Sequence, residues 1–232
     1  MRETIVDRAY AKTLLPPRKE DGHKGDFGKL LVLGGSVGYT GAPYLAASAA
    51  VHSGCGLVYL GVPESIWAVE AQKCVSAMPF PLPETDGRLC LAALDKMQDK
   101  LKGCDVLALG PGLGRGKETE QLVHALLWQV KEPLVLDADG LNALQGCTEK
   151  LDVRRGRVTI LTPHDGEFAR LTDRTLREIA SSGQSLRAAL PALTAVSWCS
   201  RGTGRALRCR TGGCSSTQAA APRFQRVGAG MC

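Results

Sequence analysis

At 232 residues, the chain has room for one α/β domain with a full hydrophobic core. It has no apolar run long enough to span a bilayer and no charged-then-apolar leader, so we expect no membrane partner and a cytoplasmic location. The net charge of +6 comes from the end of the chain, where seven arginines are the only charged side chains after Glu178, and residues 1–178 carry a net −1. These arginines come without lysines or interleaved aromatic residues, so no nucleic-acid partner is expected.

The nine cysteines do not have the spacing of metal ligands, and no Cys-x-x-Cys pair occurs. The five that precede residue 180 stand singly, mostly beside apolar positions. We therefore expect buried free thiols in a reducing compartment rather than disulfides.

The chain begins with a polar segment that leads into a βαβ unit. Residues 1–21 predict a helix and an arm, which Pro16-Pro17 interrupts. A buried strand at Lys29–Leu33 then enters a glycine turn, followed by an alanine- and serine-rich helix over about 41–53 and a second strand at Leu57–Val62. Glycine suits the places where this backbone turns tightly or approaches a ligand.

The turn and helix start after the first strand predict an anion site. The first turn of the helix, which contains Ala42, leaves free N–H groups at the carboxyl end of the strand, and these suit a phosphate or another anionic group. Gly35, Ser36 and Tyr39 are candidates for lining the same cleft. The charged residues that flank the strand are interpreted as a solvated loop rather than a catalytic group: Lys24, Asp26 and Lys29.

Strands and helices continue to alternate, which predicts a parallel sheet with right-handed crossovers. The later predicted elements are a helix from Pro63 to about Gln72, a mostly irregular stretch with a short strand over 73–90, a helix at Leu91–Leu101, a strand at Cys104–Leu109, a helix at Glu118–Val130, a strand at Pro133–Leu136, a helical turn at Leu141–Leu144, a strand at Thr159–Leu161 and a helix beginning in Gly166–Leu171. Because ligands bind at the carboxyl edge of such sheets, Gly35, Gly112, Asp139 and His164 are expected along one edge.

The glycine-rich turn Gly110-Pro111-Gly112-Leu113-Gly114 has two interpretations. It is either a backbone cradle for phosphate or ribose oxygens or an ordinary turn between a strand and a helix. The three other motifs at strand ends favour the cradle.

Asp137 and Asp139 flank Ala138 at the end of a strand, so their side chains point to opposite sides. One carboxylate is expected to face the cleft and position a hydroxyl or a Mg²⁺-bound water, and the other to cap the helical turn that follows. We favour Asp139 and Asn142 in the cleft. In the alternative, both aspartates are turn or cap residues.

His164 follows Pro163, and Glu167 lies three residues later at the start of a helix. The imidazole is expected to hydrogen-bond a polar ligand group. Glu167 is expected to cap the helix or to hold His164 in one tautomer.

Four ordered segments between about residues 20 and 172 resemble the NAD(P)H-hydrate dehydratase family, which has a ribokinase-like fold. They are HKGDFGKLLVLGGS with the following Tyr39–Ala47 region, LGPGLG at Leu109–Gly114, VLDADGLNAL at Val135–Leu144 and LTPHDGEF at Leu161–Phe168. The resemblance implies a doubly wound, mostly parallel sheet with helices on both faces. It also implies that Ala42, His164 and a glycine of the 110–114 turn, Gly112 or Gly114, contact the hydrated nicotinamide dinucleotide.

The activity implied by the resemblance is dehydration of (S)-NADHX or (S)-NADPHX, coupled to hydrolysis of ADP or ATP with Mg²⁺. The substrate hydroxyl would be phosphorylated and phosphate would then leave. Homo-oligomers are implied in the same way. The alternatives are a small-molecule kinase of the same fold, whose phosphorylated product would accumulate, and a non-catalytic nucleotide-binding remnant.

Two motifs of the family's second half are absent. One is a strand that ends LKG.[RT]T and touches the adenine nucleotide. The other is GGSGDVL, whose Asp is the general base and whose glycines form an anion hole, so we assign no catalytic residue. We therefore divide the chain into an incomplete ribokinase-like domain, 1–180, and an arginine-rich tail, 181–232, that is expected to be poorly ordered.

The tail sequence is consistent with translation out of frame. One base upstream, the codons of 197–205 permit VLVLKGHRT, and those of 214–232 permit FVNTSGSPAIPTGGSGDV preceded by Leu. The valine codons across Trp198/Cys199 and Met231/Cys232 are forced, because Trp and Met each have a single codon ending in G. The family's Asp would be encoded across Gly230/Met231. The sequence therefore predicts a truncated and impaired enzyme.

Overall fold

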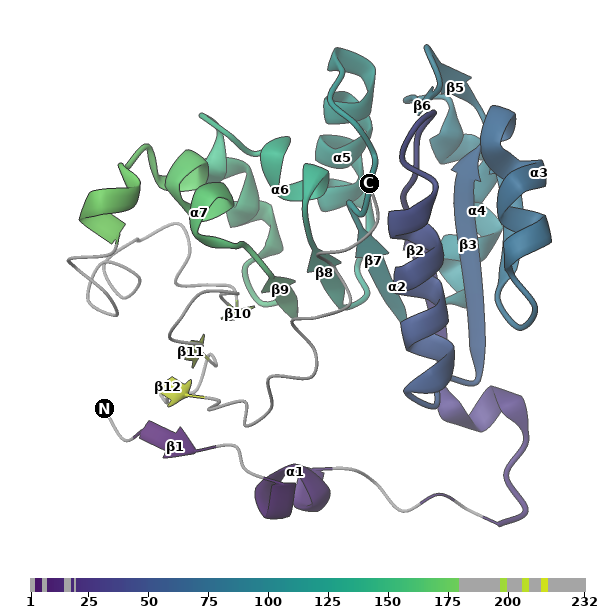
Figure 1. The fold of residues 1–232 in the computed structure, drawn as a ribbon, viewed down its shortest axis with the longest axis horizontal. Helices are drawn as coiled ribbons and strands as arrows, with labels where there is room; N and C mark the ends of the chain where they lie inside the picture. The colour runs from purple at the N-terminus through teal and green to yellow at the C-terminus, as the bar shows by residue number, and fades with distance from the viewer. Residues whose placement is uncertain are drawn as a thin grey trace.

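The computed structural model describes residues 3–5, 8–14, 18, 20–179, 197–199, 206–208 and 214–216. The strands are β1 (Glu3–Ile5), β2 (Lys29–Leu33), β3 (Leu57–Pro63), β4 (Met78–Leu82), β5 (Glu84–Thr85), β6 (Arg88–Leu89), β7 (Val106–Leu109), β8 (Leu134–Leu136), β9 (Thr159–Leu161), β10 (Ser197–Cys199), β11 (Ala206–Arg208) and β12 (Cys214–Ser216). The helices are α1 (Arg8–Leu14), η1 (Lys24–Phe27), α2 (Gly41–His52), α3 (Glu64–Lys73), α4 (Ala93–Gly103), α5 (Lys117–Gln129), α6 (Asp139–Asn142), η2 (Thr148–Arg154) and α7 (Asp165–Thr172) (Figure 1).

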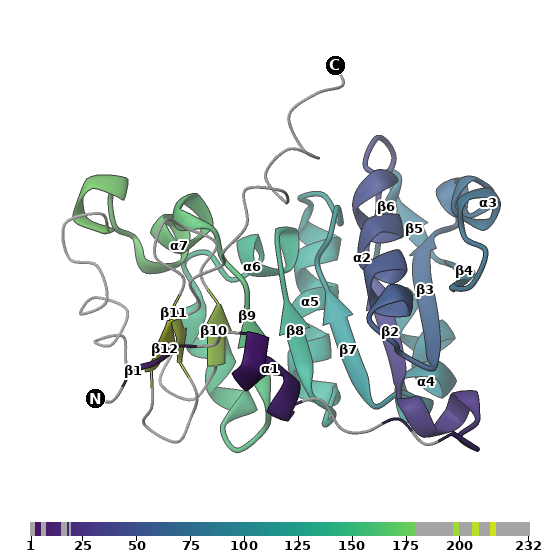
Figure 2. The ribbon, with the colours of Figure 1, turned by 60° about the horizontal axis from the view of Figure 1, so that its bottom comes forward.

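Ten strands form one sheet in the order β1-β12-β11-β10-β9-β8-β7-β2-β3-β4 (Figure 2). Every pair from β10 to β4 is parallel, whereas β11 pairs antiparallel with both of its neighbours. The predicted parallel sheet is therefore confirmed. A separate two-stranded hairpin, β5–β6, lies between α3 and α4 in the chain.

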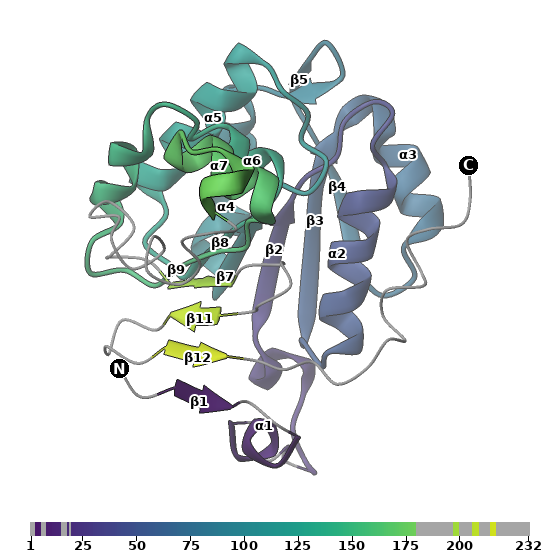
Figure 3. The ribbon, with the colours of Figure 1, turned by 60° about the vertical axis from the view of Figure 1, so that its left-hand side comes forward.

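Helices cover both faces of the sheet, and the strand residues divide between them by alternation (Figure 3). Leu31 and Leu33 of β2 pack into a core with residues of α4, α5 and α7. Val32, between them, packs into a second core with residues of α2 and α3. Runs of leucine and valine without polar alternation are typical of strands buried on both faces.

The α2 face of β8 and β9 differs from that of β2. Val135 and Ile160 lie between residues of the first core, so they point toward the α2 face, but they belong to neither core and are only half-buried.

The two ends of the described chain differ from the sequence predictions. The helix predicted from residue 1 begins only at Arg8, and Glu3–Ile5 form strand β1 instead, paired with β12. The segment after residue 180, which shows no strand periodicity, contributes β10, β11 and β12 to the sheet. Strands of three residues are held mainly by backbone hydrogen bonds to a neighbouring strand. Their sequences therefore need not show an alternating side-chain pattern. The predicted poor order of 181–232 otherwise falls outside the described residues.

At the other edge of the sheet, β4 is the outermost strand. It confirms the short strand predicted within 73–90. It carries Pro79 and Pro81, which pair with Leu60 and Val62 of β3. The indole Nε1 of Trp67 on α3 donates a hydrogen bond to the carbonyl oxygen of Pro79 at 3.2 Å.

The five cysteines within residues 20–179 are free, and Cys90 and Cys104 are buried. Burial raises the pKa of the Cys104 thiol to about 11, so this side chain is neutral near pH 7. Free thiols were predicted, although Cys55, Cys74 and Cys147 are only half-buried. Within the described residues, no helix is both long and apolar enough to cross a bilayer.

Candidate functional site

The turns after β2, β7 and β8 are joined by backbone hydrogen bonds at the carboxyl edge of the sheet. Gly35 N–H donates to the Pro111 carbonyl at 2.9 Å, and Gly110 N–H donates to the Leu33 carbonyl at 3.1 Å. Asp137 N–H donates to the Leu109 carbonyl at 3.1 Å. The motifs predicted to share one sheet edge are thus brought together there.

Gly110 is required by packing. Its φ is +131°, and a Cβ built on it would lie 1.7 Å from the Asp137 carbonyl oxygen. The glycine therefore permits the β7 and β8 turns to approach. This contact explains without a phosphate why residue 110 is a glycine, and the cradle interpretation of the turn stays a prediction.

Gly112 places the β7 turn against the start of α2. A Cβ on Gly112 would lie 2.9 Å from the Tyr39 carbonyl oxygen and 3.3 Å from the Ala42 Cβ, and its φ is +68°. The buried Ser36 hydroxyl donates to the Gly112 carbonyl at 2.8 Å. Tyr39, in contrast, is 63% exposed. These contacts bring four predicted cleft residues into one surface.

The first turn of α2 is not capped by a side chain. Thr40 occupies the N-cap position but makes no side-chain cap hydrogen bond. Its hydroxyl instead accepts from Lys73 Nζ at 2.7 Å, and Lys73 is held by the buried carboxylate of Glu70 at 3.1 Å. The Thr40 side chain therefore does not occupy the N–H groups at the start of α2, and ligand binding at Ala42 stays a prediction.

Asp139 links the glycine turn to α6. One carboxylate oxygen accepts from Gly114 N–H at 2.9 Å and the other from the Asn142 amide at 3.0 Å. The Asn142 amide oxygen in turn accepts from Arg170 Nε at 3.0 Å. Asp137 points elsewhere and accepts from the Thr162 hydroxyl at 2.8 Å. The two aspartates diverge as alternation requires, and the N-cap of α6 is Ala138 rather than either of them.

Ala138 has a strained backbone. Its φ is +49° and its ψ is −117°, a combination that residues with a Cβ rarely adopt. The strain persists because the hydrogen bonds of Asp137 and Asp139 fix the residues on both sides. Strain at a ligand-binding edge is common in functional sites.

We expect Ala138→Gly to raise the free energy of unfolding by about 1 kcal/mol, because relief of the strain outweighs the extra freedom of glycine in the unfolded chain. Urea unfolding followed by circular dichroism measures the change. Ala71→Gly is the matched control: Ala71 is exposed within α3, and the change there should cost about 1 kcal/mol. A loss at both positions would contradict the strain argument.

His164 and Glu167 form a reciprocal cap at the start of α7. His164 Nδ1 accepts from Gly166 N–H at 3.0 Å and Glu167 N–H at 3.3 Å, and Glu167 Oε2 accepts from His164 N–H at 2.9 Å. Because Nδ1 accepts, the ring proton is on Nε2, which lies 3.2 Å from Glu167 Oε1. Glu167 therefore caps α7 and also fixes the tautomer, so both predicted roles are combined. The His164 side chain remains 51% exposed.

The structure does not bring every predicted residue into one contact network. Gly35, Ser36, Tyr39, Ala42, Gly112, Gly114, Asp139 and Asn142 are contiguous. His164 and Glu167 lie at the end of β9, joined to the others through α7, whose Arg170 bonds Asn142. A ligand that touched both groups would extend along the sheet edge.

Arg88 is a residue of this edge that sequence reasoning missed. It lies in the β5–β6 hairpin, where Ser36 and Arg88 form a backbone bridge and Val37 N–H donates to the Gly87 carbonyl at 2.9 Å. A Cβ on Gly114 would lie 3.0 Å from Arg88 Nε. The available signal was Asp86-Gly87, a pair typical of tight hairpin turns, and both residues have positive φ.

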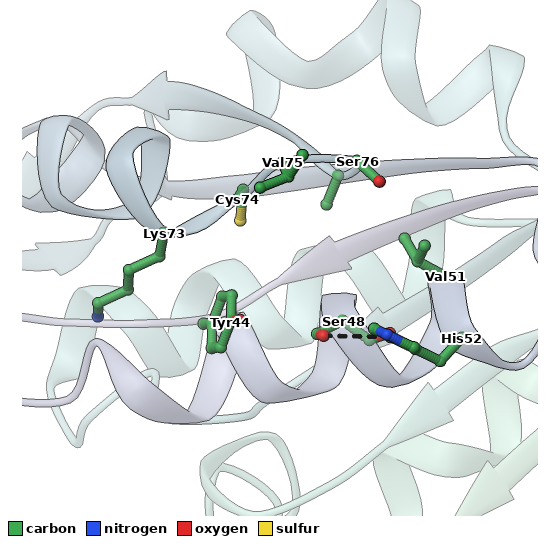
Figure 4. A pocket seen from close by; sticks show the side chains of 9 residues that line it. Tyr44, Ser48, Val51, His52, Lys73, Cys74, Val75 and Ser76 are labelled. Atoms are coloured by element: carbon green, nitrogen blue, oxygen red, sulfur yellow. Dashed lines mark hydrogen bonds between the residues drawn. The ribbon is translucent and has the colours of Figure 1, made fainter.

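A groove of about 250 Å³ lies away from these residues, between α2 and the segment that joins α3 to β4 (Figure 4). Tyr44, Ser48 and His52 line one side, and Lys73 and Cys74 line the other. His52 Nδ1 lies 2.7 Å from the Ser48 carbonyl oxygen. None of the predicted site residues lines this groove.

Solved structures with the same arrangement define the class of protein. A hypothetical protein, SMU.573 from Streptococcus mutans, superposes with a TM-score of 0.75 and 26% identity over 97% of this chain and 77% of that one. A ribokinase-like superfamily protein from Enterococcus faecalis gives 0.68 at 20% identity, over 89% of this chain and 68% of that chain. The ADP/ATP-dependent NAD(P)H-hydrate dehydratase of Bacillus subtilis, co-crystallised with ATP/Mg²⁺, gives 0.70 at 24% identity, covering 94% and 73%. The predicted ribokinase-like fold is confirmed.

Residues 30–196 match the NAD(P)H-hydrate dehydratase family, and the chain belongs to it. The bifunctional NAD(P)H-hydrate repair enzyme Nnr of Moorella thermoacetica is 45% identical over 176 residues, which are 75% of this chain and 33% of that protein. The ADP-dependent (S)-NAD(P)H-hydrate dehydratase of Neisseria meningitidis is 37% identical over 164 residues, 70% of this chain and 51% of that protein. The chain thus spans about a third to a half of these relatives.

Proposed function

We propose that this chain carries the dinucleotide side of an ADP- or ATP-dependent (S)-NAD(P)H-hydrate dehydratase, a hydro-lyase that restores NADH or NADPH in the cytoplasm. The observation that supports it is the packing of Gly112 against Ala42 at the uncapped first turn of α2. Free N–H groups and a glycine surface without side chains suit a flat, phosphate-bearing ligand. His164, with Nε2–H fixed by its cap, supplies a donor farther along the same edge.

The adenine nucleotide and its metal are a separate part of the proposal. Among the described residues, no group of three or more His, Cys, Asp or Glu side chains is placed to hold a metal ion. Mg²⁺ often binds through substrate phosphates with only one or two carboxylates, so we propose that it arrives with ADP or ATP. No step is assigned to it here.

We also propose that this chain is impaired in turnover. Phosphorylation of the substrate hydroxyl needs a base to take its proton and donors to stabilise the charge on the phosphate. The family assigns both to GGSGDVL, which is absent from this reading frame. Sequencing the gene over the last 60 or so codons tests the origin of the loss: codons 197–232 must spell VLVLKGHRT and GGSGDV in the neighbouring frame.

The activity test incubates the purified chain with NADHX or NADPHX, Mg²⁺ and either ADP or ATP, and follows the absorbance of reduced nicotinamide. We expect binding of the hydrates by calorimetry but little turnover. Turnover at ordinary enzyme rates would contradict the impairment, and accumulation of a phosphorylated product would indicate a kinase.

His164→Ala tests the dinucleotide site itself. It should weaken hydrate binding about tenfold, the effect of one lost hydrogen bond to a polar ligand. His52→Ala, on the exposed side of α2, is the control and should bind like the unchanged chain. Equal hydrate affinity in the unchanged chain, His164→Ala and His52→Ala would show that His164 does not contact the hydrate.

A further inference from the structure

The β5–β6 hairpin places one arginine over the glycine turn of the site. The backbone bridge between Ser36 and Arg88 and the hydrogen bond from Val37 to Gly87 fix the hairpin against the β2–α2 loop. A Cβ on Gly87 would lie 2.4 Å from Val37 Cγ2, so the contact needs a glycine there as well. Arg88 is therefore held by backbone contacts on the loop that carries the predicted cleft residues.

The glycine turn after β7 leaves room for this side chain. A Cβ on Gly114 would lie 3.0 Å from Arg88 Nε and 3.2 Å from the Ser36 hydroxyl oxygen. A Cβ on Gly116 would lie 3.6 Å from Arg88 Cδ. The guanidinium thus lies across Gly114, beside the hydroxyl that bonds Gly112. Glycine at position 114 therefore leaves space for the Arg88 side chain and also allows the positive φ of the turn.

The charge on Arg88 has no counter-ion in the described part of the chain. Its hydrogen-bond partner is the Asp86 carbonyl oxygen, 3.3 Å from Nη1, and among the described residues no carboxylate lies within 4.0 Å of it. Two acids of the surrounding segments are bonded elsewhere: Asp139 accepts from Gly114 and Asn142, and Glu118 accepts from the hydroxyl of Thr85 on the paired strand. Arg88 is half-buried, and the Asp86 carbonyl satisfies only one of the five donors of its guanidinium, which favours an anion at this position.

We propose that Arg88 binds a phosphate group of the dinucleotide, so that the hairpin contributes a specificity-determining residue to the site. The inference rests on the proposed function. Arginine binds phosphate through two parallel N–H···O bonds, and the neighbouring uncapped first turn of α2 offers further donors. The phosphate is either in the pyrophosphate, common to both hydrates, or the ribose 2′-phosphate, found only in NADPHX.

The test compares Arg88→Gln with the unchanged full chain by calorimetry, using NADHX, NADPHX and inorganic pyrophosphate as separate ligands. We expect Arg88→Gln to weaken binding about tenfold to a hundredfold, the range for a lost charge-assisted hydrogen bond. The salt dependence of affinity should become shallower, which a purely structural role would not cause. Arg88→Lys keeps the positive charge but loses the planar guanidinium that can bind two phosphate oxygens, so its affinity should lie between those of Arg88→Gln and the unchanged chain.

Comparing the losses of affinity for the three ligands shows which phosphate group Arg88 binds. An equal loss for both hydrates and for pyrophosphate assigns Arg88 to the pyrophosphate, whereas a loss for NADPHX alone assigns it to the 2′-phosphate. Arg155→Gln removes the same charge from an exposed residue of the opposite edge and should change nothing. Thermal unfolding of each variant confirms that the folded state is retained.

The outcomes also distinguish this inference from the proposed function. Hydrate binding that Arg88→Gln leaves unchanged overturns the role of Arg88 and leaves the function standing. Pyrophosphate binding that depends on Arg88, in a chain that binds neither hydrate, overturns the function and leaves the phosphate site standing. Binding of none of the three ligands by the unchanged chain overturns both.

Discussion

Gly110→Ala is expected to abolish most or all of the folding stability of this chain. The added methyl would lie 1.7 Å from the Asp137 carbonyl oxygen and 2.8 Å from Gly140 N. Both are backbone atoms, so no side-chain rotation relieves the clash. The φ of +131° adds strain of about 1–3 kcal/mol for any residue with a Cβ.

The clash cannot be absorbed by local movement because the turn is fixed on both sides. Gly110 N–H bonds Leu33, and Asp137 N–H bonds Leu109, so β7 is held between β2 and β8. Separating these strands would open the core around Leu109 and Leu136. Overpacking costs about 1–3 kcal/mol in cores that can adjust, and more is expected here, against a total stability of about 5–15 kcal/mol.

Urea unfolding or, if the variant does not accumulate, soluble yield measures the effect. The control is Gly103→Ala, at the last residue of α4, where a Cβ meets nothing within 4 Å. It should be neutral or stabilising by less than about 1 kcal/mol. A Gly110→Ala protein within about 1 kcal/mol of the unchanged chain would contradict the packing assigned to this turn.

The second large effect is expected at Arg154, a completely buried arginine at the amino edge of the sheet. Its guanidinium donates to the carbonyl oxygens of Val130 and Glu132 and to the Thr159 hydroxyl. These bonds connect η2 to the loop after α5 and to the start of β9. Three segments distant in sequence thus share one side chain.

Arg154→Ala should lower the free energy of unfolding by about 3–5 kcal/mol, because it leaves several buried acceptors without donors and removes a large packed side chain. Arg154→Lys should recover only part of this, since an ammonium does not span acceptors arranged for a planar fork. Arg155→Ala, whose side chain is 66% exposed, is the control and should change stability by less than about 0.5 kcal/mol.

The contribution of Arg154 to stability depends on pH only in the alkaline range. Burial lowers the pKa of Arg154 from its ordinary value to about 10, so the folded chain binds fewer protons than the unfolded chain only from about that pH up to the ordinary pKa of arginine. The contribution of this group to stability therefore rises with pH in that alkaline window and is constant below it. We expect the loss in Arg154→Ala to be the same at pH ~6 and pH ~8; a clear difference would mean that another titrating group contributes.

The sequence predicted the elements with strong hydrophobic patterns well. The strand at Lys29–Leu33 has the predicted bounds, and the helix predicted over about 41–53 is Gly41–His52. These elements bury continuous apolar runs or one apolar face, which sequence periodicity reports. The order of the strands was not readable, because parallel neighbours are chosen by three-dimensional packing rather than by any local signal.

The site was predicted in part for the same reason. Glycines and aspartates at strand ends were placed on one edge because every parallel strand ends there, and the contacts among Ser36, Gly112 and Asp139 follow that rule. The glycine at position 110 is required by a carbonyl oxygen of the segment after the next strand, a contact that the sequence does not show. Arg88 was missed because a hairpin with two-residue strands carries it across to another turn. The binding roles of these residues remain predictions.

The outermost strand of the parallel half, β4, limits how copies of this chain associate. Residues two apart in a strand direct their backbone groups to the same side, so Pro79 and Pro81 remove two successive donors from the free margin. The Pro79 carbonyl, an acceptor on that margin, is already taken by the Trp67 indole. A strand added at this edge would therefore lack backbone donors and an acceptor for regular pairing. Joining two copies through β4, or extending a fibril from this edge of the sheet, is therefore disfavoured.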